Sequence, residues 1–312
     1  MDYNWKQKYY LKEQVCETAF QDEGPFWFIT AEKKDWTVFL NDDDFKVAQN
    51  ATAVNVARSG VKVYVDVHMD THAHWMMAGS KAQCELFFEG WKRAIWAWDR
   101  QRNGKSSLYD WGVQISEIPN LVALRNIAAY IARNPYVAMR DKTPTGYLYG
   151  SADLFFNDNI NFLADGVPFS SLASSRRREI CRTRDYSLPE SYRVINGCIT
   201  KKSYIQLPGL ELFFNSGNQY FNMLARHAES DLAIAKSIGE MIRIPDDEMF
   251  SIICRMIKDQ FGNTYRIRDL SPDQRMAIAK KMHFEYNSTN AQIARMLSIP
   301  VSAVDRMFPI PQ

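Results

Sequence analysis

An alternating run of β-branched residues, followed closely by two histidines, constrains the fold of this chain most strongly. Residues 61–67 read Val-Lys-Val-Tyr-Val-Asp-Val directly after Gly60, and His72 and His74 follow in the string Thr-His-Ala-His. The alternation and the β-branched content predict a strand. Because side chains alternate across a strand, His72 and His74 project from one face, close enough to share a metal ion.

A second string places a tyrosine and an asparagine on one side of a helix. Residues 120–134 are expected to form this helix, and its end reads Tyr130-Ile-Ala-Arg-Asn134-Pro135. Residues four apart on a helix lie one above the other, so Tyr130 and Asn134 share a face. Pro135 is expected to stop or kink the helix.

The segments around these strings alternate between strand and helix patterns. A β-α-β order followed by further helices predicts an α+β fold, in which helices pack on a face of an antiparallel sheet. The expected strands are 26–30, 36–40, 61–67 and 74–78, the last continuing or pairing with the one before it, and the expected helices are 43–58 and 84–100.

Taken in this order, the strings resemble the one-tyrosine HUH endonucleases, in particular the REP-associated tyrosine transposases. That family has a strand motif close to Met-Pro-Asn-His-x-His and a helix motif close to Tyr-Ile-x-x-Asn-Pro. Here the strand motif reads Met-Asp-Thr-His-Ala-His over 69–74, and the helix motif is intact over 130–135. Asp70-Thr71 replaces the usual Pro-Asn, and Ala132 stands where the family often has histidine. The resemblance covers about residues 20–160, and its further matches are 24–30, 41–45, 102–104 and 147–151.

The resemblance implies a ferredoxin-like antiparallel sheet and a metal-dependent single-strand DNA endonuclease and strand transferase. Tyr130 would be the nucleophile that forms a 5′-phosphotyrosine at hairpin or palindromic repeats, and His72, His74 and Asn134 would hold Mg²⁺ or Mn²⁺. His68 and Asp70 share the parity of the histidine pair if the strand stays regular, so either could replace Asn134 as a ligand, although the resemblance favours Asn134.

Composition and charge indicate which other classes of protein this chain does not resemble. The net charge of +2 is no global nucleic-acid signature, but residues 166–312 carry 20 Lys and Arg against 15 Asp and Glu, which suits phosphate contact. The polar start and the lack of a long apolar run predict no signal segment and no membrane span. Five scattered cysteines predict reduced thiols. Together with the resemblance, this predicts a bacterial cytoplasmic, nucleoid-associated protein.

We divide the chain into a nuclease domain over 1–165, a basic linker over 166–204 and a helical C-terminal domain over 205–312. In the linker, a solvated segment and a DNA-backbone contact are about equally expected for the arginines. The tryptophans of the expected helix 84–100 could stack on single-stranded bases, but their helical spacing favours packing in the core. The linker arginines are Arg176, Arg177, Arg178, Arg182 and Arg184, and the tryptophans are Trp91, Trp96 and Trp98.

The last segment has the pattern of a helix-turn-helix near residues 272–308, with the two helices over 289–306. Small Ala294 permits close helix crossing, and Leu297, Ile299 and Val304 are expected to fill the core. Ser302 would cap or begin the second helix. The residues that would face a groove of duplex DNA are Ser302, Ala303, Asp305 and Arg306. Upstream, the run Pro-Asp-Asp-Glu over 245–248 predicts a helix start.

Three rival functions remain at this point. A regulator derived from a transposase would bind the repeats without cutting them. A replication or conjugation initiator of the HUH class often carries paired tyrosines or a helicase, and the sequence has no G-x-x-x-x-G-K-[ST] loop. A two-histidine RNA phosphoesterase would need a second histidine–threonine motif, which is absent.

Overall fold

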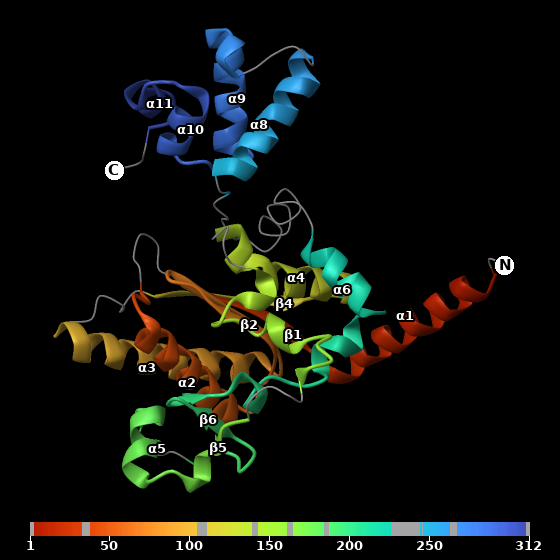
Figure 1. Ribbon diagram of the computed structural model, residues 1–312, viewed down its shortest axis with the longest axis vertical. Coiled ribbons are helices and arrows are strands. Elements are labelled where there is room, and N and C mark those ends of the chain that lie inside the picture. Colours follow the sequence, from red (N-terminus) through yellow and green to blue (C-terminus); the bar gives the residue numbers. More distant parts are fainter. Residues whose placement is uncertain are drawn as a thin grey trace. The chain divides into compact units, whose positions relative to one another are not determined.

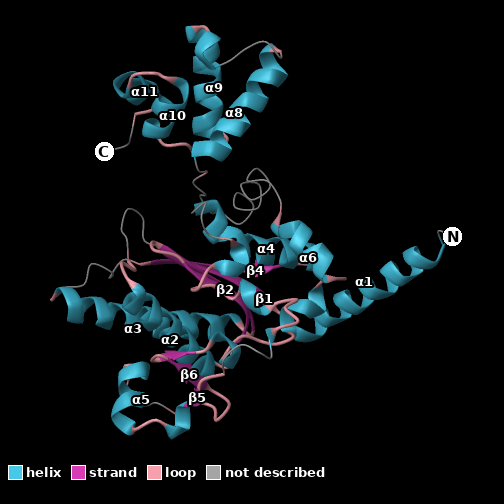
Figure 2. Cartoon of the chain, in the orientation of Figure 1, coloured by secondary structure: helices cyan, strands magenta, loops and turns pink. Residues whose placement is uncertain are grey.

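The computed structural model describes residues 3–32, 38–104, 111–138, 143–160, 165–183, 187–225, 244, 246–262 and 267–309. The chain divides into two compact units, one of residues 1–135 with 142–225 and one of residues 136–141 with 226–312. In the first unit an antiparallel sheet carries helices on both faces, and the second unit is helical (Figures 1 and 2).

The first unit is built on a four-stranded antiparallel sheet in the order β2-β3-β1-β4. The central strands β3 and β1 are buried along most of their length, and the alternating run of residues 61–67 forms the edge strand β2, which is buried except at Lys62. The predicted strand at 74–78 pairs with the strand before it instead of continuing it. The strands are β1 (Phe26–Glu32), β2 (Lys62–His68), β3 (His72–Ala78) and β4 (Gly112–Ile118).

Helices α2 (Asp42–Ser59) and α3 (Lys81–Asn103) pack on one face of this sheet. Both helices begin at side-chain caps, Asn41 for α2 and a Ser80–Gln83 capping box for α3, and both end at a glycine with positive φ. Trp91 of α3 lies against Trp75 of β3, with ring centroids 4.7 Å apart. These are the helices that the sequence predicts at 43–58 and 84–100.

Helix α4 (Leu121–Ala138) covers the opposite face of the sheet. It continues for three residues past Pro135, so of the two expectations for this residue, a stop or a kink, the stop is wrong. Proline lacks the amide hydrogen and removes one bond of the helix, but the helix continues past it here. In Figure 1, α4 lies above the sheet while α2 and α3 lie below it.

The described residues of the segment 166–204, which the sequence predicts to be a linker, are folded onto the first unit. They form a small sheet of β5 (Val167–Pro168), β6 (Arg193–Ile195) and β7 (Cys198–Ile199), together with helix α5 (Ser174–Cys181). The turn between β6 and β7 is Asn196-Gly197, both at positive φ, which is the sequence that a two-residue hairpin requires.

Buried polar side chains of α2 hold this hairpin in place. Gln49 Nε2 donates to the Ile199 carbonyl at 2.7 Å, and Asn50 Nδ2 donates to the Gly197 carbonyl at 3.0 Å. The Ile199 amide donates back to Asn50 Oδ1 at 2.7 Å. The segment is therefore not a linker, and the first unit extends to residue 225.

Two other segments differ from the expectation. The predicted strand at 36–40 is not formed in its described part, because the amides of Val38 and Phe39 both donate to the carbonyl of Asp70 in the β2–β3 turn. Its first two residues lie outside the described residues. An additional helix, α1 (Tyr3–Glu23), precedes the sheet and packs against the 3₁₀ turn Gly209–Phe213, which leads to α6 (Gly217–Leu224).

The second unit has one apolar core beneath its helices. Helix α8 begins at Asp246, within the predicted start signal. Helices α10 and α11 are joined by residues 298–300. Leu297 and Val304 are buried in the core as predicted, whereas Ile299 is only partly buried against it, and Ala294 is buried as well. Helix α11 begins at Val301, one residue before Ser302. The helices are α8 (Asp246–Phe261), α9 (Pro272–Phe284), α10 (Asn290–Leu297) and α11 (Val301–Met307).

None of the helices within the described residues is both long enough and apolar enough to span a membrane.

Candidate active site

The two histidines of β3 face α4 and lie side by side. Strand β3 begins at His72, directly after a turn that the Met69 amide closes by donating to the His72 carbonyl at 2.7 Å. His72 and His74 occupy alternate positions, and their ring centroids are 4.7 Å apart. The predicted common face is therefore present.

Helix α4 brings Tyr130 and Asn134 to the same place. His72 Nε2 lies 2.9 Å from Asn134 Oδ1, and the ring centroid of Tyr130 lies 5.5 Å from that of His74. Tyr130 is 4% exposed and also contacts Phe28 of β1 edge to face. The strand and the helix thus place four side chains, separated by about 60 residues of sequence, in one cluster.

Two threonines orient the imidazoles, and sequence reasoning missed this role for both. Thr30 lies directly opposite His74 in the β1–β3 register, with its Oγ1 3.2 Å from His74 Nδ1. Thr71 Oγ1 lies 2.9 Å from His72 Nδ1. Because a threonine hydroxyl lies within hydrogen-bond distance of each Nδ1 atom, the Nε2 atoms are directed toward the cluster. In metal-binding histidines the ring nitrogen that does not bind the metal is likewise hydrogen-bonded to a neighbouring group. The sequence signal that could have identified Thr30 is its position in the expected strand 26–30, which pairs with the strand that carries His74.

The hydrogen bond to Asn134 fits one tautomer of His72. An amide oxygen only accepts, so the Nε2–H of a neutral His72 donates to Asn134 Oδ1 and its Nδ1 accepts from the Thr71 hydroxyl. A hydroxyl can also accept, so Thr71 can support the other tautomer, in which Nε2 presents a lone pair to a metal ion.

Burial keeps both imidazoles neutral. It lowers the pKa of His72, against the raising effects of the Asn134 hydrogen bond and of the negative charges of Glu32 and Asp70. Burial and the neighbouring His72 hold the pKa of His74 well below its ordinary value. Neutral imidazole is the form that binds a metal ion.

Two imidazole nitrogens and one amide oxygen are donors that a divalent cation can bind. In this structure the 2.9 Å contact between His72 Nε2 and Asn134 Oδ1 is a hydrogen bond, which a bound cation would replace. Among the described residues, no group of three or more His, Cys, Asp and Glu side chains is placed to hold a metal, so a metal here would take the amide oxygen as its third ligand.

The two alternative ligands are not part of the cluster. Because the strand breaks at the turn over 69–71, His68 pairs with Ala73 and faces the opposite side of the sheet from His72. There its Nε2 lies 3.0 Å from Thr52 Oγ1 and its ring meets Trp75. Asp70 lies in the turn with an exposed side chain. The assumption of a regular strand was wrong.

The α5 arginines proposed for DNA contact lie away from the cluster. Helix α5 packs on α2, which is on the face of the sheet opposite α4. Arg176 forms an ion pair with Glu179 at 2.5 Å, and the Arg182 guanidinium lies 4.3 Å from the centre of the Trp98 ring. Ser302 and Arg306 are exposed on α11 of the second unit. Arg184 lies outside the described residues.

Only one of the three tryptophans belongs to the core. Trp91 is fully buried, as expected. Trp96 and Trp98 are half-buried near the end of α3, where Trp98 Nε1 donates to Asp44 Oδ1 at 2.6 Å and Arg100 lies over the Trp96 ring at 5.3 Å. The expectation that all three fill the core was therefore wrong for two of them.

Comparison with known proteins gives little beyond this geometry. No protein-family model matches the sequence, and no curated protein matches it either. One solved structure, a REP-associated tyrosine transposase bound to a REP hairpin, aligns with 56% of this chain and 94% of its own, at 14% identity and a TM-score of 0.34. Because that superposition is so weak, the functional argument rests on the residues of the cluster.

Proposed function

We propose that the protein is a metal-dependent single-strand DNA endonuclease and strand transferase of the HUH type, built on a ferredoxin-like sheet. The observation that carries this proposal is the convergence of His72, His74, Tyr130 and Asn134 from β3 and α4. Two neutral imidazoles and an amide oxygen beside a tyrosine hydroxyl suit one chemistry well, the attack of a phenolic oxygen on a phosphodiester.

His72, His74 and Asn134 would hold Mg²⁺ or Mn²⁺. Nitrogen and oxygen donors with positions left for water and phosphate oxygens favour these ions over a closed structural zinc site. The bound cation would supply charge stabilisation to the non-bridging oxygens of the scissile phosphate. Thr30 and Thr71 would act as positioning residues, because they touch only the far nitrogens of the imidazoles.

Tyr130 would carry the covalent step. Its oxygen attacks phosphorus, the bond between phosphorus and the 3′ oxygen breaks, and the proton lost by the phenol is balanced by the one that the leaving 3′ hydroxyl takes up. The product is a 5′-phosphotyrosine. Attack by another 3′ hydroxyl reverses the step and joins strands, so strand transfer requires no nucleotide cofactor.

The remaining parts of the chain would bind the DNA. The substrate would be a hairpin or palindromic repeat, and helices α10 and α11 would form a helix-turn-helix that adds duplex contact through Ser302 and Arg306. Both side chains are exposed, and the three-residue connection with Ser298 in the left-handed region supports a tight helix pair. Arg176, Arg177, Arg178 and Arg182 would contact the phosphate backbone.

The test is the formation of a covalent adduct. End-labelled single-stranded hairpins from DNA flanking the gene are incubated with the full chain and Mn²⁺ or Mg²⁺, and adducts are separated under denaturing conditions. The expected result is a labelled protein band that needs the metal and disappears in Tyr130→Phe.

Matched variants separate catalysis from folding. His72→Ala and Asn134→Ala are expected to lose the adduct at low metal concentration, while Tyr136→Phe, a neighbouring tyrosine on the same helix, should keep it. An adduct that survives in Tyr130→Phe would refute the assignment of the nucleophile. Tight hairpin binding with no adduct under any metal would instead identify a non-cutting repeat-binding protein.

A further inference from the structure

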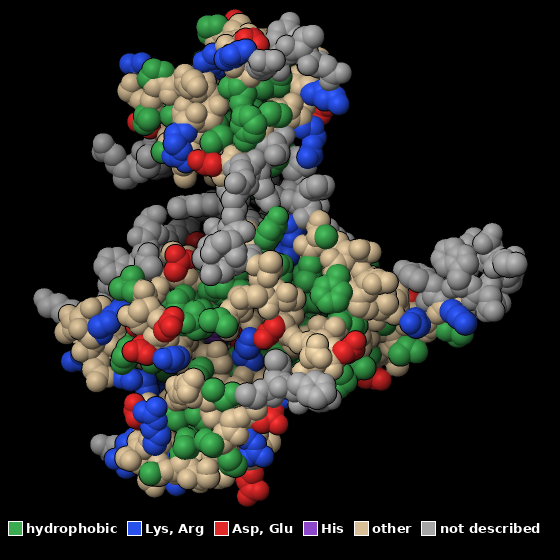
Figure 3. All heavy atoms as spheres, in the orientation of Figure 1, with side chains coloured by type: hydrophobic (Ala, Val, Ile, Leu, Met, Phe, Trp, Pro, Cys, Tyr) green, Lys and Arg blue, Asp and Glu red, His purple; other side chains and the backbone are tan. Residues whose placement is uncertain are grey.

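A cavity of about 680 Å³ lies in the first unit, separate from the cluster of His72, His74, Tyr130 and Asn134. It is lined by parts of the segments 156–160 and 202–211 and by the first turns of α6. Figure 3 shows hydrophobic side chains at the surface in the region of α6. One of the lining residues is Phe221 of α6, whose side chain is 41% exposed, so an aromatic ring of this cavity is open to solvent.

The cavity lies on the side of the sheet that carries Tyr130. The 3₁₀ turn before α6 ends at Phe213, whose ring centroid lies 5.2 Å from that of Phe26. Phe26 shares a face of β1 with Phe28, which contacts the ring of Tyr130. From α4, Arg125 Nε donates to the Phe213 carbonyl. A strand bound at Tyr130 would therefore run on the same side of the sheet as the cavity.

A phenylalanine with a strained backbone forms another wall of the cavity. Phe156 has φ 51°, which a bulky residue rarely adopts. Glu211 fixes this conformation, because its Oε1 accepts from the Phe156 amide at 2.6 Å. Gly217 leaves room for the ring, since a Cβ there would lie 3.2 Å from Phe156 Cδ1. Such strain persists only where the surroundings hold it, and it recurs at ligand sites. The rings of Phe156 and Phe221 are 6.4 Å apart.

The charged groups of the cavity favour a ligand with N–H donors over a phosphate. Lys202 is engaged, because its Nζ donates to the Ile160 carbonyl at 3.1 Å and pairs with Asp165 at 2.7 Å. The carboxylates of Asp158 and Glu211 also line the cavity. Glu211 uses Oε1 for a backbone amide, but a carboxylate has further acceptor positions. A planar group that carries an N–H donor would therefore be complementary to this cavity.

We infer that the cavity receives one base of a single DNA strand, and that this base carries an exocyclic amino group. The base stacks on Phe221, and its amino group donates to Glu211. An aromatic ring accepts any base, whereas a carboxylate accepts from the amino group of cytosine, adenine or guanine, which thymine lacks. The phosphates stay outside, away from the carboxylates. The inference rests on the proposed function for the single strand as the ligand.

The test compares two strands that differ mainly in this amino group. Fluorescein-labelled homopolymers of cytosine and of thymine, each of about 20 nucleotides, are titrated by anisotropy into the full chain at pH 8 without added metal. The wild-type protein is expected to bind the cytosine strand about 5-fold more tightly or better. Glu211→Gln is expected to abolish this preference, because glutamine still accepts from the Phe156 amide but presents an NH₂ donor in place of the second oxygen.

Matched variants isolate the cavity. Phe221→Ala is expected to weaken the binding of both strands about 5-fold or more, and Phe221→Tyr, which keeps a ring, to retain the affinity. Glu117→Gln removes an exposed acid from β4, and Tyr10→Ala removes a 68% exposed ring from α1. Both of these controls should bind like the parent.

Four outcomes overturn the inference. They are equal affinity of the wild-type protein for the two strands, a preference that persists in Glu211→Gln, Phe221→Ala binding like Phe221→Tyr, and controls that lose as much affinity as the cavity variants. Free deoxycytidine monophosphate is titrated as well. If it binds as tightly as the cytosine strand, the cavity is a site for a free nucleotide and its assignment to a DNA strand is wrong.

The two proposals fail separately. If the wild-type protein forms the phosphotyrosine adduct while the Glu211 and Phe221 variants bind both strands normally, only this inference is wrong. If the protein prefers the cytosine strand through Glu211 and no adduct forms under any metal, only the proposed endonuclease activity is wrong.

Discussion

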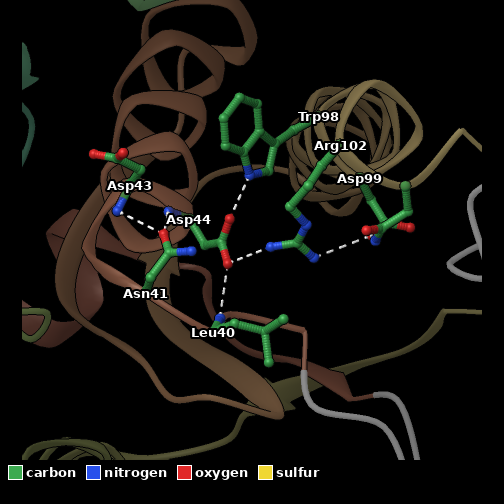
Figure 4. A network of polar contacts seen from close by, with 8 residues as sticks. Leu40, Asn41, Asp43, Asp44, Trp98, Asp99 and Arg102 are labelled. Carbon is green, nitrogen blue, oxygen red and sulfur yellow. Dashed lines mark hydrogen bonds and ion pairs between the residues drawn. The ribbon is translucent and has the colours of Figure 1, made fainter.

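Replacing Asp44 by alanine tests whether one buried carboxylate holds the first turn of α2 against the last turns of α3. The Asp44 side chain has no exposed surface and joins three donors, Trp98 Nε1, the Leu40 amide and the guanidinium of Arg102 (Figure 4). Removing it leaves those donors without their acceptor in a region where water replaces it poorly.

The magnitude follows from the charge left behind. Breaking a buried ion pair by removing one partner costs about 3–5 kcal/mol, and the two further hydrogen bonds to the carboxylate belong to the same network, so their costs do not simply add. We expect Asp44→Ala to lower the free energy of unfolding by about 3–5 kcal/mol. Asp99 accepts from Arg102 at 3.2 Å and limits the loss, which makes the lower end of the range the better expectation.

Asp43 is the matched control. It is the adjacent residue in the first turn of the same helix, but its side chain is 74% exposed and its ion pair with Lys46 lies at the surface. Asp43→Ala should cost less than about 1 kcal/mol. Urea unfolding followed by tryptophan fluorescence reports the first unit, and equal losses in the two variants would refute the reasoning.

Three other predictions follow from the described contacts. Gly90→Ala should lower the midpoint temperature of unfolding, because the new Cβ would lie 1.9 Å from the Oδ1 of buried Asn55. This clash should outweigh the gain in helix propensity of about 1 kcal/mol. An unchanged midpoint would contradict the close approach of α2 and α3. The free energy of unfolding should fall as the pH drops below about 6.5, because burial lowers the pKa of His68, His72 and, most of all, His74, so that the unfolded chain binds more protons than the native one. Urea unfolding at pH 7.5 and 5.0 measures this loss, and a His74→Gln variant should lose less stability between the two pH values. Arg275→Ala should speed amide exchange in the second unit, since Arg275 donates to the Leu297 carbonyl at 3.1 Å and to that of Arg268 at 3.1 Å, whereas Arg268→Ala should leave exchange unchanged.

Much of the first unit could be predicted because its signals are local. Alternation along β2 and β3 gave the common face of His72 and His74, and the spacing on α4 gave that of Tyr130 and Asn134. These features depend on the geometry of one strand or one helix, which the order of residues specifies directly. The start of α8 at Asp246 was predictable for the same reason.

The prediction failed where distant segments determine the structure. Residues 166–204 are rich in serine and arginine and have no long periodic pattern, yet Gln49 and Asn50 of α2 supply the hydrogen bonds that order their hairpin. A polar side chain on a helix gives no sign in the sequence that it will be buried against a turn about 150 residues later. The Asn196-Gly197 pair was a readable hairpin signal, and it was missed.

The sequence by itself determined which residues share a face, because backbone geometry sets the direction of each side chain within one element. It could not determine that His68 turns away from the pair, since that depends on where the strand breaks to pair with its neighbour. Only the packing of α4 across β3 decided that Asn134 meets His72 at 2.9 Å, and only the docking of α5 decided where its arginines lie. Contacts between elements depend on the whole core, and no short stretch of sequence encodes them.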